Sequence, residues 1–399
     1  MTLFSTVELA PRDPILGITE QFVADPNPHK VNLGVGMYYD ENGKLPLLKC
    51  VAAVEQAMAE AHAARGYLPI DGIAEYDKAA QRLAFGESSP AVAEQRIATV
   101  QGLGGTGALK VAADFLKRLR PQAPVLISDP SWENHRALFT QAGFEVGTYP
   151  YYDPTSHGVR FDDMLAALNT APAGTVVVLH ACCHNPTGCD LAPEQWREVT
   201  ASARAHGWVP LLDMAYQGFG RGLDEDAAAA RLFVDAGLEC LVATSFSKNF
   251  SLYGERVGAL SVVCRQREEA QRVLSQLKVL IRANYSNPPT HGAKAVAAVL
   301  ADPVLRKLWH DELAQMRERI RGMREHLIAK LRDAGVRQDM SFIARQQGMF
   351  SYSGLSVEQM RRLRSEFSVY GVDSGRICVA ALNDHNLAHV AQAIARVMQ

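Results

Sequence analysis

The sequence predicts an α/β fold, with a mostly parallel sheet sandwiched by helices and a smaller α/β domain attached to it. Between residues 96 and 263, short apolar runs alternate with stretches of helical periodicity. The apolar runs are nearly continuous, as in strands that are buried on both faces. After Pro303 the pattern changes to one long amphipathic stretch followed by short strands and a helix. This change indicates a second, smaller unit.

Six apolar runs are the predicted strands of the sheet: Arg96–Val100, Pro124–Ser128, Thr175–Leu179, Val209–Leu212, Cys240–Thr244 and Val257–Val263. Helical patterns fall between several of them, over Ala108–Leu119, Pro193–His206 and Asp226–Ala236. Strands of this kind separated by helices favour a parallel sheet that is covered on both faces.

The C-terminal region predicts one long helix, Leu305–Ala334, with a kink near Gly322 as an option. Two strands and a last helix follow, at Gly348–Tyr352, Arg376–Ala380 and Leu387–Met398. The segment Pro14–Tyr39 has few core-forming residues, so we expect it to pack with the C-terminal region. The predicted division is an N-terminal arm (1–12), a small domain (13–45 plus 315–399) and a large domain (46–314).

Charge and hydropathy exclude several classes of function. The 399 residues include 41 basic and 43 acidic side chains, which gives no broad electrostatic footprint for nucleic acid. The basic run from Arg317 to Arg324 is interleaved with apolar residues, and we interpret it as the solvated face of an amphipathic helix rather than a polyanion site. Because no run of ~18 apolar residues and no signal-peptide pattern occurs, we expect a cytoplasmic protein without membrane partners.

The seven cysteines are an odd number without a framework spacing, which is typical of reduced thiols. Cys182, Cys183 and His184 with Cys189 could suggest a metal cluster. However, adjacent cysteines at the end of a strand are expected to point to opposite sides, and no second Cys-x-x-Cys pair exists. No metal site is therefore predicted.

Ligands of open α/β sheets gather at the carboxyl ends of the strands. The first predicted strand leads into Gly102-Leu-Gly-Gly-Thr-Gly107, which opens a helix. Backbone N–H groups and the helix dipole at such a position suit a phosphate. Taken alone, this loop could equally be a flexible turn between strand and helix.

Three further strand ends carry polar residues. Asn185 lies in His180-Ala-Cys-Cys-His-Asn-Pro-Thr-Gly188, where the proline restricts the backbone around the asparagine. Asp213 directly follows a predicted buried strand, and a buried carboxylate needs a partner. Lys248 and Arg256 follow the strand Cys240–Thr244.

Each of these residues has an ordinary explanation by itself. Lysines in loops are mostly solvated, an aspartate can cap a helix, and an arginine can form a surface ion pair. Together they meet the needs of pyridoxal phosphate (PLP), which requires an amine, a carboxylate against its ring nitrogen, donors for its ring oxygen and a phosphate cup. The sequence therefore predicts PLP as the cofactor.

Four motifs carry a resemblance to a known family. Ser245-Phe-Ser-Lys-Asn-Phe250, Gly254-Glu-Arg-Val-Gly258, His184-Asn-Pro-Thr-Gly188 and Asp213-Met-Ala-Tyr-Gln-Gly-Phe219 resemble the class I (fold-type I) PLP-dependent aspartate and aromatic-amino-acid aminotransferases. The similarity covers nearly the whole chain, from Asp13-Pro-Ile-Leu-Gly17 to Ser374-Gly-Arg376. It implies the fold of the PLP-dependent transferases of fold type I.

The resemblance implies roles for the residues around the cofactor ring. Lys248 would hold the cofactor covalently and then move the proton between substrate and cofactor. Asp213 would pair with the ring nitrogen, with His180 either supporting it or serving only the structure. The ring oxygen and the ring face would be contacted by Tyr216, Asn185 and Trp132.

The resemblance also implies how the phosphate and the substrate are held. The phosphate would be bound by Gly105, Thr106, Ser245, Ser247 and Arg256, and by Tyr67 of a second subunit. Arg376 would grip the α-carboxylate of the substrate, with Gly36, Trp132 and Asn185 beside it. Arg282, again from a second subunit, would bind a distal carboxylate. A homodimer with shared active sites is thus implied, and the arm before Pro14 would lie on the neighbour.

The family resemblance leaves two substrate classes open. Glu133-Asn-His after Trp132, and Gly254 near the lysine motif, resemble the bacterial aromatic-amino-acid (tyrosine) aminotransferases, whereas Arg282-Ala-Asn-Tyr-Ser-Asn-Pro-Pro289 resembles the aspartate enzymes equally. We predict ping-pong transfer from tyrosine, phenylalanine and aspartate to 2-oxoglutarate; the alternative is a strict aspartate aminotransferase. Dual use requires Arg282 to swing aside or find other partners, since burying it unpaired would cost several kcal/mol.

Rival functions remain on the same scaffold. β-Lyases, decarboxylases and synthases also use it, although Arg282 together with Arg376 favours transamination. Aminotransferase-like domains of transcription regulators need an attached DNA-binding module, and motifs that begin near Asp13 leave no room for one. An inactive homologue is disfavoured because Lys248, Asp213 and Arg376 are all present.

Overall fold

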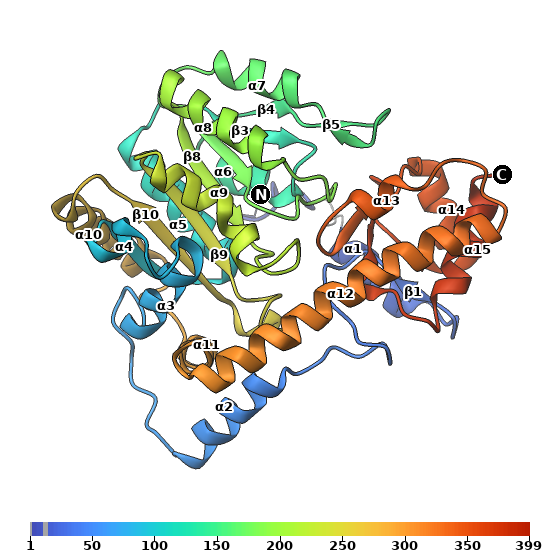
Figure 1. Ribbon diagram of the computed structural model, residues 1–399, viewed down its shortest axis with the longest axis horizontal. Helices are drawn as coiled ribbons and strands as arrows, with labels where there is room; N and C mark the ends of the chain where they lie inside the picture. The colour runs from blue at the N-terminus through green and yellow to red at the C-terminus, as the bar shows by residue number, and fades with distance from the viewer. Residues whose placement is uncertain (1, 11–14) are drawn as a thin grey trace.

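The computed structural model describes residues 2–10 and 15–399, and a seven-stranded sheet lies at its centre (Figure 1). The strand order is β2-β10-β9-β8-β7-β3-β4. β10 is antiparallel to both of its neighbours, and the other pairs are parallel. The strands are β2 (Ile97–Leu103), β3 (Val125–Asp129), β4 (Val146–Pro150), β7 (Val176–His180), β8 (Val209–Met214), β9 (Cys240–Ser245) and β10 (Val257–Val263). The predicted mostly parallel sheet is confirmed.

Helices cover both faces of the sheet, because successive side chains of its central strands point to opposite sides. Leu211 and Leu241 belong to one buried cluster, whereas their neighbours Leu212 and Val242 belong to another. The first cluster includes α5 (Gly104–Leu119), α6 (Glu133–Gln141) and α10 (Arg267–Asn284). The second includes α3 (Ala74–Phe85), α7 (Phe161–Asn169), α8 (Pro193–His206) and α9 (Leu223–Asp235).

All six strands predicted for the central sheet are present, and the seventh strand of that sheet was not predicted. β2 extends to Leu103, so α5 begins at Gly104 inside the predicted glycine loop. The missed strand is β4, whose side chains are partly exposed except for Tyr149. It lies at the edge of the sheet, where one side of the strand is unpaired and a continuous apolar run is not required.

The long helix α12 (Pro303–Asp333) runs without interruption from the sheet to the C-terminal elements (Figure 1). Asp302 begins it as a side-chain cap, accepting hydrogen bonds from the N–H groups of Val304 (2.7 Å) and Leu305 (3.0 Å), and Pro303 occupies the first helical position. The option of a break at Gly322 is not realised. The helix packs against α14 (Val357–Phe367), α15 (Leu387–Val397) and the antiparallel strands β11 (Phe350–Tyr352) and β13 (Arg376–Cys378) as one smaller α/β unit.

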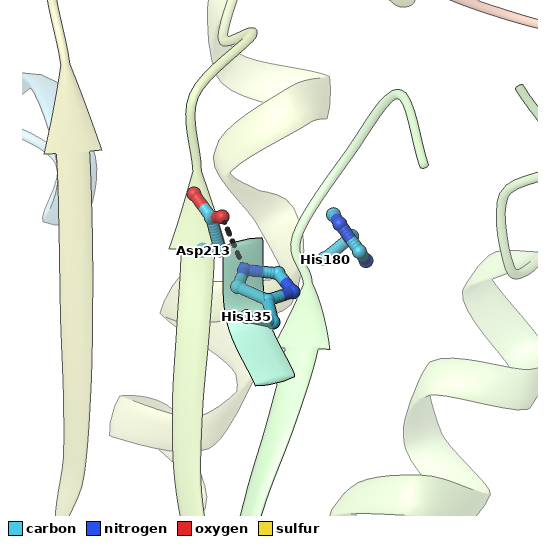
Figure 2. A group of neighbouring side chains, drawn as sticks. All are labelled: His135, His180 and Asp213. Carbon is cyan, nitrogen blue, oxygen red and sulfur yellow. Dashed lines mark hydrogen bonds and ion pairs between the residues drawn. The ribbon is translucent and has the colours of Figure 1, made fainter. Parts of the chain in front are cut away.

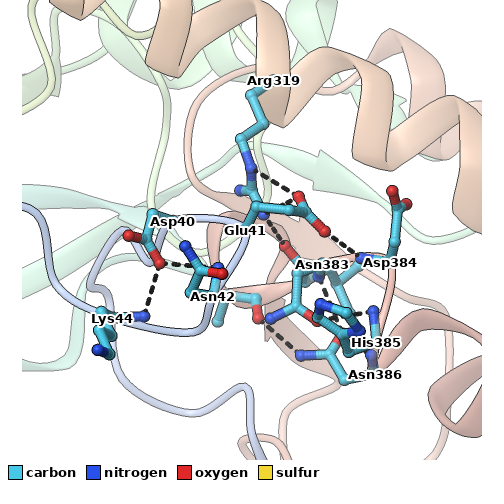
Figure 3. Close-up of polar contacts among 11 residues, drawn as sticks. Asp40, Glu41, Asn42, Lys44, Arg319, Asn383, Asp384, His385 and Asn386 are labelled. Carbon is cyan, nitrogen blue, oxygen red and sulfur yellow. Dashed lines mark hydrogen bonds and ion pairs between the residues drawn. The ribbon is translucent and has the colours of Figure 1, made fainter.

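The N-terminal segment joins this smaller unit. β1 (Val31–Asn32) pairs in parallel with β12 (Val369–Tyr370), next to α1 (Leu16–Ala24). In Figure 3, Glu41 receives hydrogen bonds from Arg319 of α12 (3.1 Å) and from the N–H of Asp384 (2.7 Å). The expectation that this segment packs with the C-terminal region is confirmed; Asp13 and Pro14 lie outside the described residues. The predicted domain limits stay a prediction.

The remaining elements are short or connect these units: α2 (Lys49–Glu60), α4 (Pro90–Ala93), α11 (His291–Ala301), α13 (Phe342–Arg345), β5 (Tyr152–Asp153), β6 (Gly158–Val159) and 3₁₀ turns at Tyr253–Glu255 and Val379–Ala381. Among the helices of the described residues, none has the length and apolar character needed to cross a membrane.

All seven cysteines lie in the described part of the chain, and each is free and buried. The expectation that Cys182 and Cys183 diverge is wrong: ligand atoms of both, and of Asp226, lie within 4.8 Å of one another. Strand alternation does not apply here, because β7 ends at His180 and Cys183 has a φ of +51°. Asp226 already accepts backbone hydrogen bonds from Gly218 (2.8 Å) and Gly220 (2.9 Å).

Candidate active site

A cavity of about 470 Å³ brings together residues from distant parts of the sequence. Twelve of the fourteen predicted site residues line it: Gly36, Gly105, Thr106, Trp132, Asn185, Asp213, Tyr216, Ser245, Ser247, Lys248, Arg256 and Arg376. The sheet register explains this convergence. Asp213 pairs with His180 across β8 and β7, and β9 ends at Ser245, so these residues lie at the carboxyl edge of three parallel strands.

Lys248 lies in this cavity, three residues beyond β9. Its Nζ is 4.7 Å from the centre of the Tyr216 ring. Burial lowers the pKa of Lys248 to about 8, although the nearby carboxylate of Asp213 opposes the shift. At pH 8 about half of the amine is therefore neutral, compared with well under about 1% of an ordinary lysine. A neutral amine can act as a nucleophile and as a base.

Asp213 is held by a histidine that the sequence reading had not selected (Figure 2). His135 Nε2 and Asp213 Oδ2 are 2.8 Å apart, and His135 Nδ1 is 2.9 Å from Ser131 Oγ. Burial raises the pKa of Asp213, but the hydrogen bond and charge of His135 outweigh it and hold that pKa below its ordinary value. Because an ionised carboxylate only accepts hydrogen bonds, His135 Nε2 is the donor.

His180 does not hold Asp213 by a hydrogen bond, so its two possible roles, support of Asp213 or a purely structural one, remain predictions. His180 lines the cavity, but neither of its ring nitrogens has a hydrogen-bond partner among the described residues. Burial and the neighbouring histidines hold the pKa of His180 well below its ordinary range, so the ring is neutral. His135 is included in the sequence analysis only as the last residue of the motif that follows Trp132, and no role is predicted for it there. Its position at the start of α6, three residues after a cavity residue, was the one available signal.

The glycine loop and Arg256 form a seat for an anion. Arg256 has a φ of +55° and donates to the backbone oxygen of Tyr253 (2.9 Å) and to Ser247 Oγ (3.4 Å). A Cβ on Gly104 would lie 2.4 Å from Arg256 Nη2, and one on Gly258 would lie 2.4 Å from the carbonyl carbon of Gly104. Both glycines are therefore needed for the guanidinium to approach the N-terminus of α5. A guanidinium beside free helix N–H groups suits a phosphate.

Arg376 provides a second, separate cationic group. It is 1% exposed and donates to the backbone oxygen of Gly34 (2.7 Å) and to Asn185 Oδ1 (3.0 Å). The guanidinium lies 4.3 Å from the centre of the Phe350 ring, and a Cβ on Gly36 would lie 2.6 Å from that ring. Within the described residues, Arg376 has no carboxylate partner and its Nε has no hydrogen-bond partner. A buried guanidinium of this kind suits an incoming carboxylate.

The loop that carries Asn185 is fixed by a buried carboxylate. Asp190 accepts hydrogen bonds from the N–H groups of Cys183 (2.7 Å) and His184 (2.8 Å). Burial raises the pKa of Asp190 to about 6. His184 is 2.9 Å from Ser128 Oγ and 2.8 Å from Thr187 Oγ1. These contacts place Asn185 beside the cavity.

Two of the predicted site residues do not reach this cavity. Tyr67 is 95% exposed, and Arg282 lies exposed on α10, where its Nη1 donates to Ser286 Oγ. Neither lines the cavity within this chain. The structure also adds cavity residues that the sequence did not select, among them Met37, Tyr253 and Phe350.

Comparisons with known proteins agree with this geometry. The family model for "Aminotransferase class I and II" matches residues 28–394. An aspartate aminotransferase of Pseudomonas aeruginosa is 59% identical over all of both chains, and an aromatic-amino-acid aminotransferase of Escherichia coli is 52% identical over 99% of this chain and 100% of that protein. The crystal structure of an aromatic-amino-acid aminotransferase from Burkholderia pseudomallei, covalently bound to pyridoxal phosphate, covers 100% of both chains with a TM-score of 0.98 and 62% identity.

The family match spans most of the chain, and the relatives match it from end to end. The central sheet is the one expected from the resemblance in sequence. The chain belongs to the class I and class II aminotransferases.

Proposed function

We propose that this chain is a PLP-dependent aminotransferase that moves the amino group of aromatic amino acids and aspartate to 2-oxoglutarate. The observation that carries the proposal is the position of Lys248, with its lowered pKa, in one cavity with ionised Asp213, the anion seat and Arg376. These four groups provide the amine, the carboxylate and the phosphate site that the cofactor requires, and a cation for the carboxylate of an amino acid. The relative from Burkholderia pseudomallei, which is covalently bound to PLP, supports the choice of cofactor.

The residues around the cavity fit the cofactor part by part. When bound, PLP supplies an electron-withdrawing ring conjugated to the carbon that receives the amino group. Asp213 would keep a proton on the ring nitrogen, and His135 would keep Asp213 ionised and oriented toward it. Tyr216 and Asn185 would donate to the ring oxygen, and Trp132 would contact the ring. Gly105, Thr106, Ser245, Ser247 and Arg256 would hold the phosphate.

Lys248 would hold the cofactor covalently and, once released, would act as an acid and base. Its pKa of about 8 suits an amine that takes the proton from the substrate Cα and then gives it up again. Arg376 would fix the α-carboxylate with two parallel hydrogen bonds, which would orient the Cα–H toward the lysine. The cofactor would keep the amino group while water supplies the oxygen of the departing 2-oxo acid, and a second 2-oxo acid would then accept the amino group, which gives ping-pong kinetics.

We also propose that the enzyme is a homodimer whose active sites are shared. Tyr67 and Arg282 are exposed, and they have the predicted roles only if a neighbouring subunit presents them. Residues 2–10 expose Leu3, Phe4 and Leu9, which are apolar side chains that a partner surface would cover. We propose a cytoplasmic location, which the seven free thiols support.

Mixed dimers test the shared site. Lys248→Ala and Arg282→Leu subunits are each expected to be inactive with aspartate as homodimers. In a hybrid, one of the two active sites would receive Lys248 and Arg282 in their native forms, because they come from different subunits. Activity should therefore return to about half of the wild-type value per hybrid dimer. Hybrids that stay inactive would contradict the exchange of Arg282 between subunits.

The proposal that both aromatic and dicarboxylic amino acids are substrates rests on the residues that line the cavity. Met37, Leu109, Trp132 and Phe350 give it an apolar side that suits an aromatic ring. The partner's Arg282 would supply the charge for a distal carboxylate. Relatives with both names are similar to the chain, the aspartate aminotransferase at 59% identity and the aromatic-amino-acid aminotransferase at 52%. The second candidate, a strict aspartate aminotransferase, is favoured by the 59% identity with the Pseudomonas aeruginosa protein.

Steady-state kinetics distinguish the two candidates. We expect kcat/KM for phenylalanine within ~1,000-fold of that for aspartate. Arg282→Leu should lower kcat/KM for aspartate by about 100-fold or more, since a charge-assisted carboxylate contact is lost, and should leave phenylalanine little changed. The matched control is Arg337→Gln, an exposed arginine outside the cavity. A kcat/KM for phenylalanine that is ~1,000-fold or more below the kcat/KM for aspartate would favour the strict aspartate aminotransferase.

A further inference from the structure

A second cavity, of about 350 Å³, lies between the middle of α12, residues 219–221 and residues 344–348. It shares no lining residue with the candidate active site. Its lining holds five arginines and a single acidic residue: Arg221, Arg317, Arg321, Arg324, Arg345 and Glu325. This charge imbalance is unusual for a protein that carries nearly equal numbers of basic and acidic residues.

The protein neutralises little of this positive charge. Glu318 serves two of the arginines, at 3.7 Å from Arg317 and 3.1 Å from Arg321. Within the described residues, Arg221, Arg324 and Arg345 have no ion-pair partner. Several guanidinium groups around one cavity repel each other and create a positive potential there.

A larger neighbouring cavity provides a comparison. It has a volume of about 780 Å³ and lies between α3, α9 and the start of α12. Arginines also line it, but carboxylates within the same cavity bind them: Arg231 pairs with Asp224 (2.8 Å) and Arg306 with Glu87 (3.1 Å). Arg221 and Arg317 line both cavities, but the carboxylates Glu87 and Asp224 lie only on the side of the larger one.

Two of the arginines are held rigidly by the fold. Arg324 is 2% exposed, and its guanidinium donates to Ser351 Oγ and to the backbone oxygens of Ile343, Gly348 and Phe350. The side chain of Arg317 is 14% exposed and donates to the backbone oxygen of Gly218 (2.9 Å). Its buried Nε has no hydrogen-bond partner among the described residues. The interpretation of the run from Arg317 to Arg324 as a solvated face is therefore wrong for these two residues.

We infer that this cavity is a binding site for a small multivalent oxyanion, either a phosphate compound or a polycarboxylate. Planar guanidinium forks match both phosphate and carboxylate oxygens. The cavity is large enough for an anion of a few oxygen-bearing groups. The exposed arginines of the lining, Arg221, Arg321 and Arg345, would donate to the anion. The terminal N–H groups of Arg324 already donate to the protein, so Arg324 would contribute its positive charge only.

The site is connected to the catalytic cavity through the backbone. Arg324 holds the backbone oxygen of Phe350 (2.6 Å), and the ring of Phe350 lies against Arg376. Arg317 holds Gly218, two residues beyond Tyr216. A bound anion would attract both arginines and so shift the position of Phe350 and of the Tyr216 loop. We therefore expect anion binding to change the KM of every substrate that carries an α-carboxylate. This expectation rests on the proposed function.

Calorimetric titration of the holoenzyme tests the binding site without using activity. We expect pyrophosphate or citrate, titrated separately, to bind the wild type. The Arg221→Gln, Arg345→Gln double variant should bind the same anion about tenfold or more weakly, since each lost charge-assisted contact matters. Both side chains are exposed, and neither takes part in the hydrogen bonds that hold Arg324, so the fold should be retained. The double variant Arg332→Gln, Arg337→Gln is the matched control, because it removes two exposed arginines outside the cavity.

Each outcome has a defined meaning. Binding of pyrophosphate alone would identify a phosphate site, and binding of citrate alone a carboxylate site. An absence of heat with both anions would overturn the proposal. Equal affinity in the double variant and the wild type would overturn it too, because the anion would then occupy another place, such as the seat at Arg256. A chain without aminotransferase activity that still binds the anion at this cavity would contradict the proposed function only.

Discussion

Lys248→Ala is expected to lower kcat for amino transfer by about 10⁴-fold or more, the upper range for loss of a positioned acid and base. The physical reason is that one amine has two roles. In the proposed function it would hold the cofactor covalently and would then take up and release the proton of the substrate Cα. No other lysine lines the cavity formed by the described residues. The measurement is the steady-state rate with aspartate and 2-oxoglutarate.

A surface lysine controls for nonspecific damage. Lys307 has 75% of its side chain exposed and pairs with Asp311, so Lys307→Ala should keep nearly full activity. Thermal unfolding of both variants would show whether the fold is intact. A folded Lys248→Ala enzyme that retains more than about 1% of the wild-type kcat would sink the assigned role.

Asp213→Ala is expected to have the second-largest effect, a fall in kcat of about 10³-fold, which corresponds to about 4 kcal/mol of barrier. Without the carboxylate, the ring nitrogen of the cofactor loses its proton and the ring withdraws electrons less strongly from the substrate Cα. His135 would also lose the partner of its Nε2. Removal of one member of a buried, hydrogen-bonded pair should lower stability as well.

Asp213→Glu separates the charge from the position. It retains the carboxylate but moves it by one methylene, so we expect an activity between those of Asp213→Ala and the wild type. Single-turnover rates with aspartate would report the chemical step directly. If Asp213→Ala and the wild type turned over at similar rates, the ring nitrogen would not depend on this carboxylate.

The sheet could be predicted from the sequence because its strands are buried on both faces. Residues 176–179 and 240–243 are apolar, and the helices α8 and α9 separate β7 from β8 and β8 from β9. Edge position removes this signal, which is why β4 was missed. The antiparallel direction of β10 could not be read either, since a buried strand has the same composition in both directions.

The site was predictable at the strand ends and less so beyond them. Asp213 lies near the end of β8 and Lys248 three residues beyond β9, so chain position alone indicated that they would lie together. His135 and His180 show the limit: both lie near Asp213, but the one that donates to it comes from α6. Side-chain partners across separate elements depend on packing, which local sequence patterns do not encode.

Arg324 shows the same limit for charge. A helical pattern of arginines predicts a solvated face, yet this side chain turns into the protein because four neutral acceptors of the segment 343–351 surround it. Exposed Tyr67 and Arg282 are the opposite case. By resemblance to the family, both residues would act in the active site of a second subunit. The geometry of one chain does not include that subunit, so the dimer stays a proposal.

The most direct test of the account is to treat the holoenzyme with borohydride, digest it and map the modified peptide by mass spectrometry. Reduction should tether the vitamin B6 group to Lys248 and to no other lysine. A cofactor that is released unreduced on denaturation, or found on a different lysine, would contradict the claim that Lys248 and Asp213 form the catalytic centre.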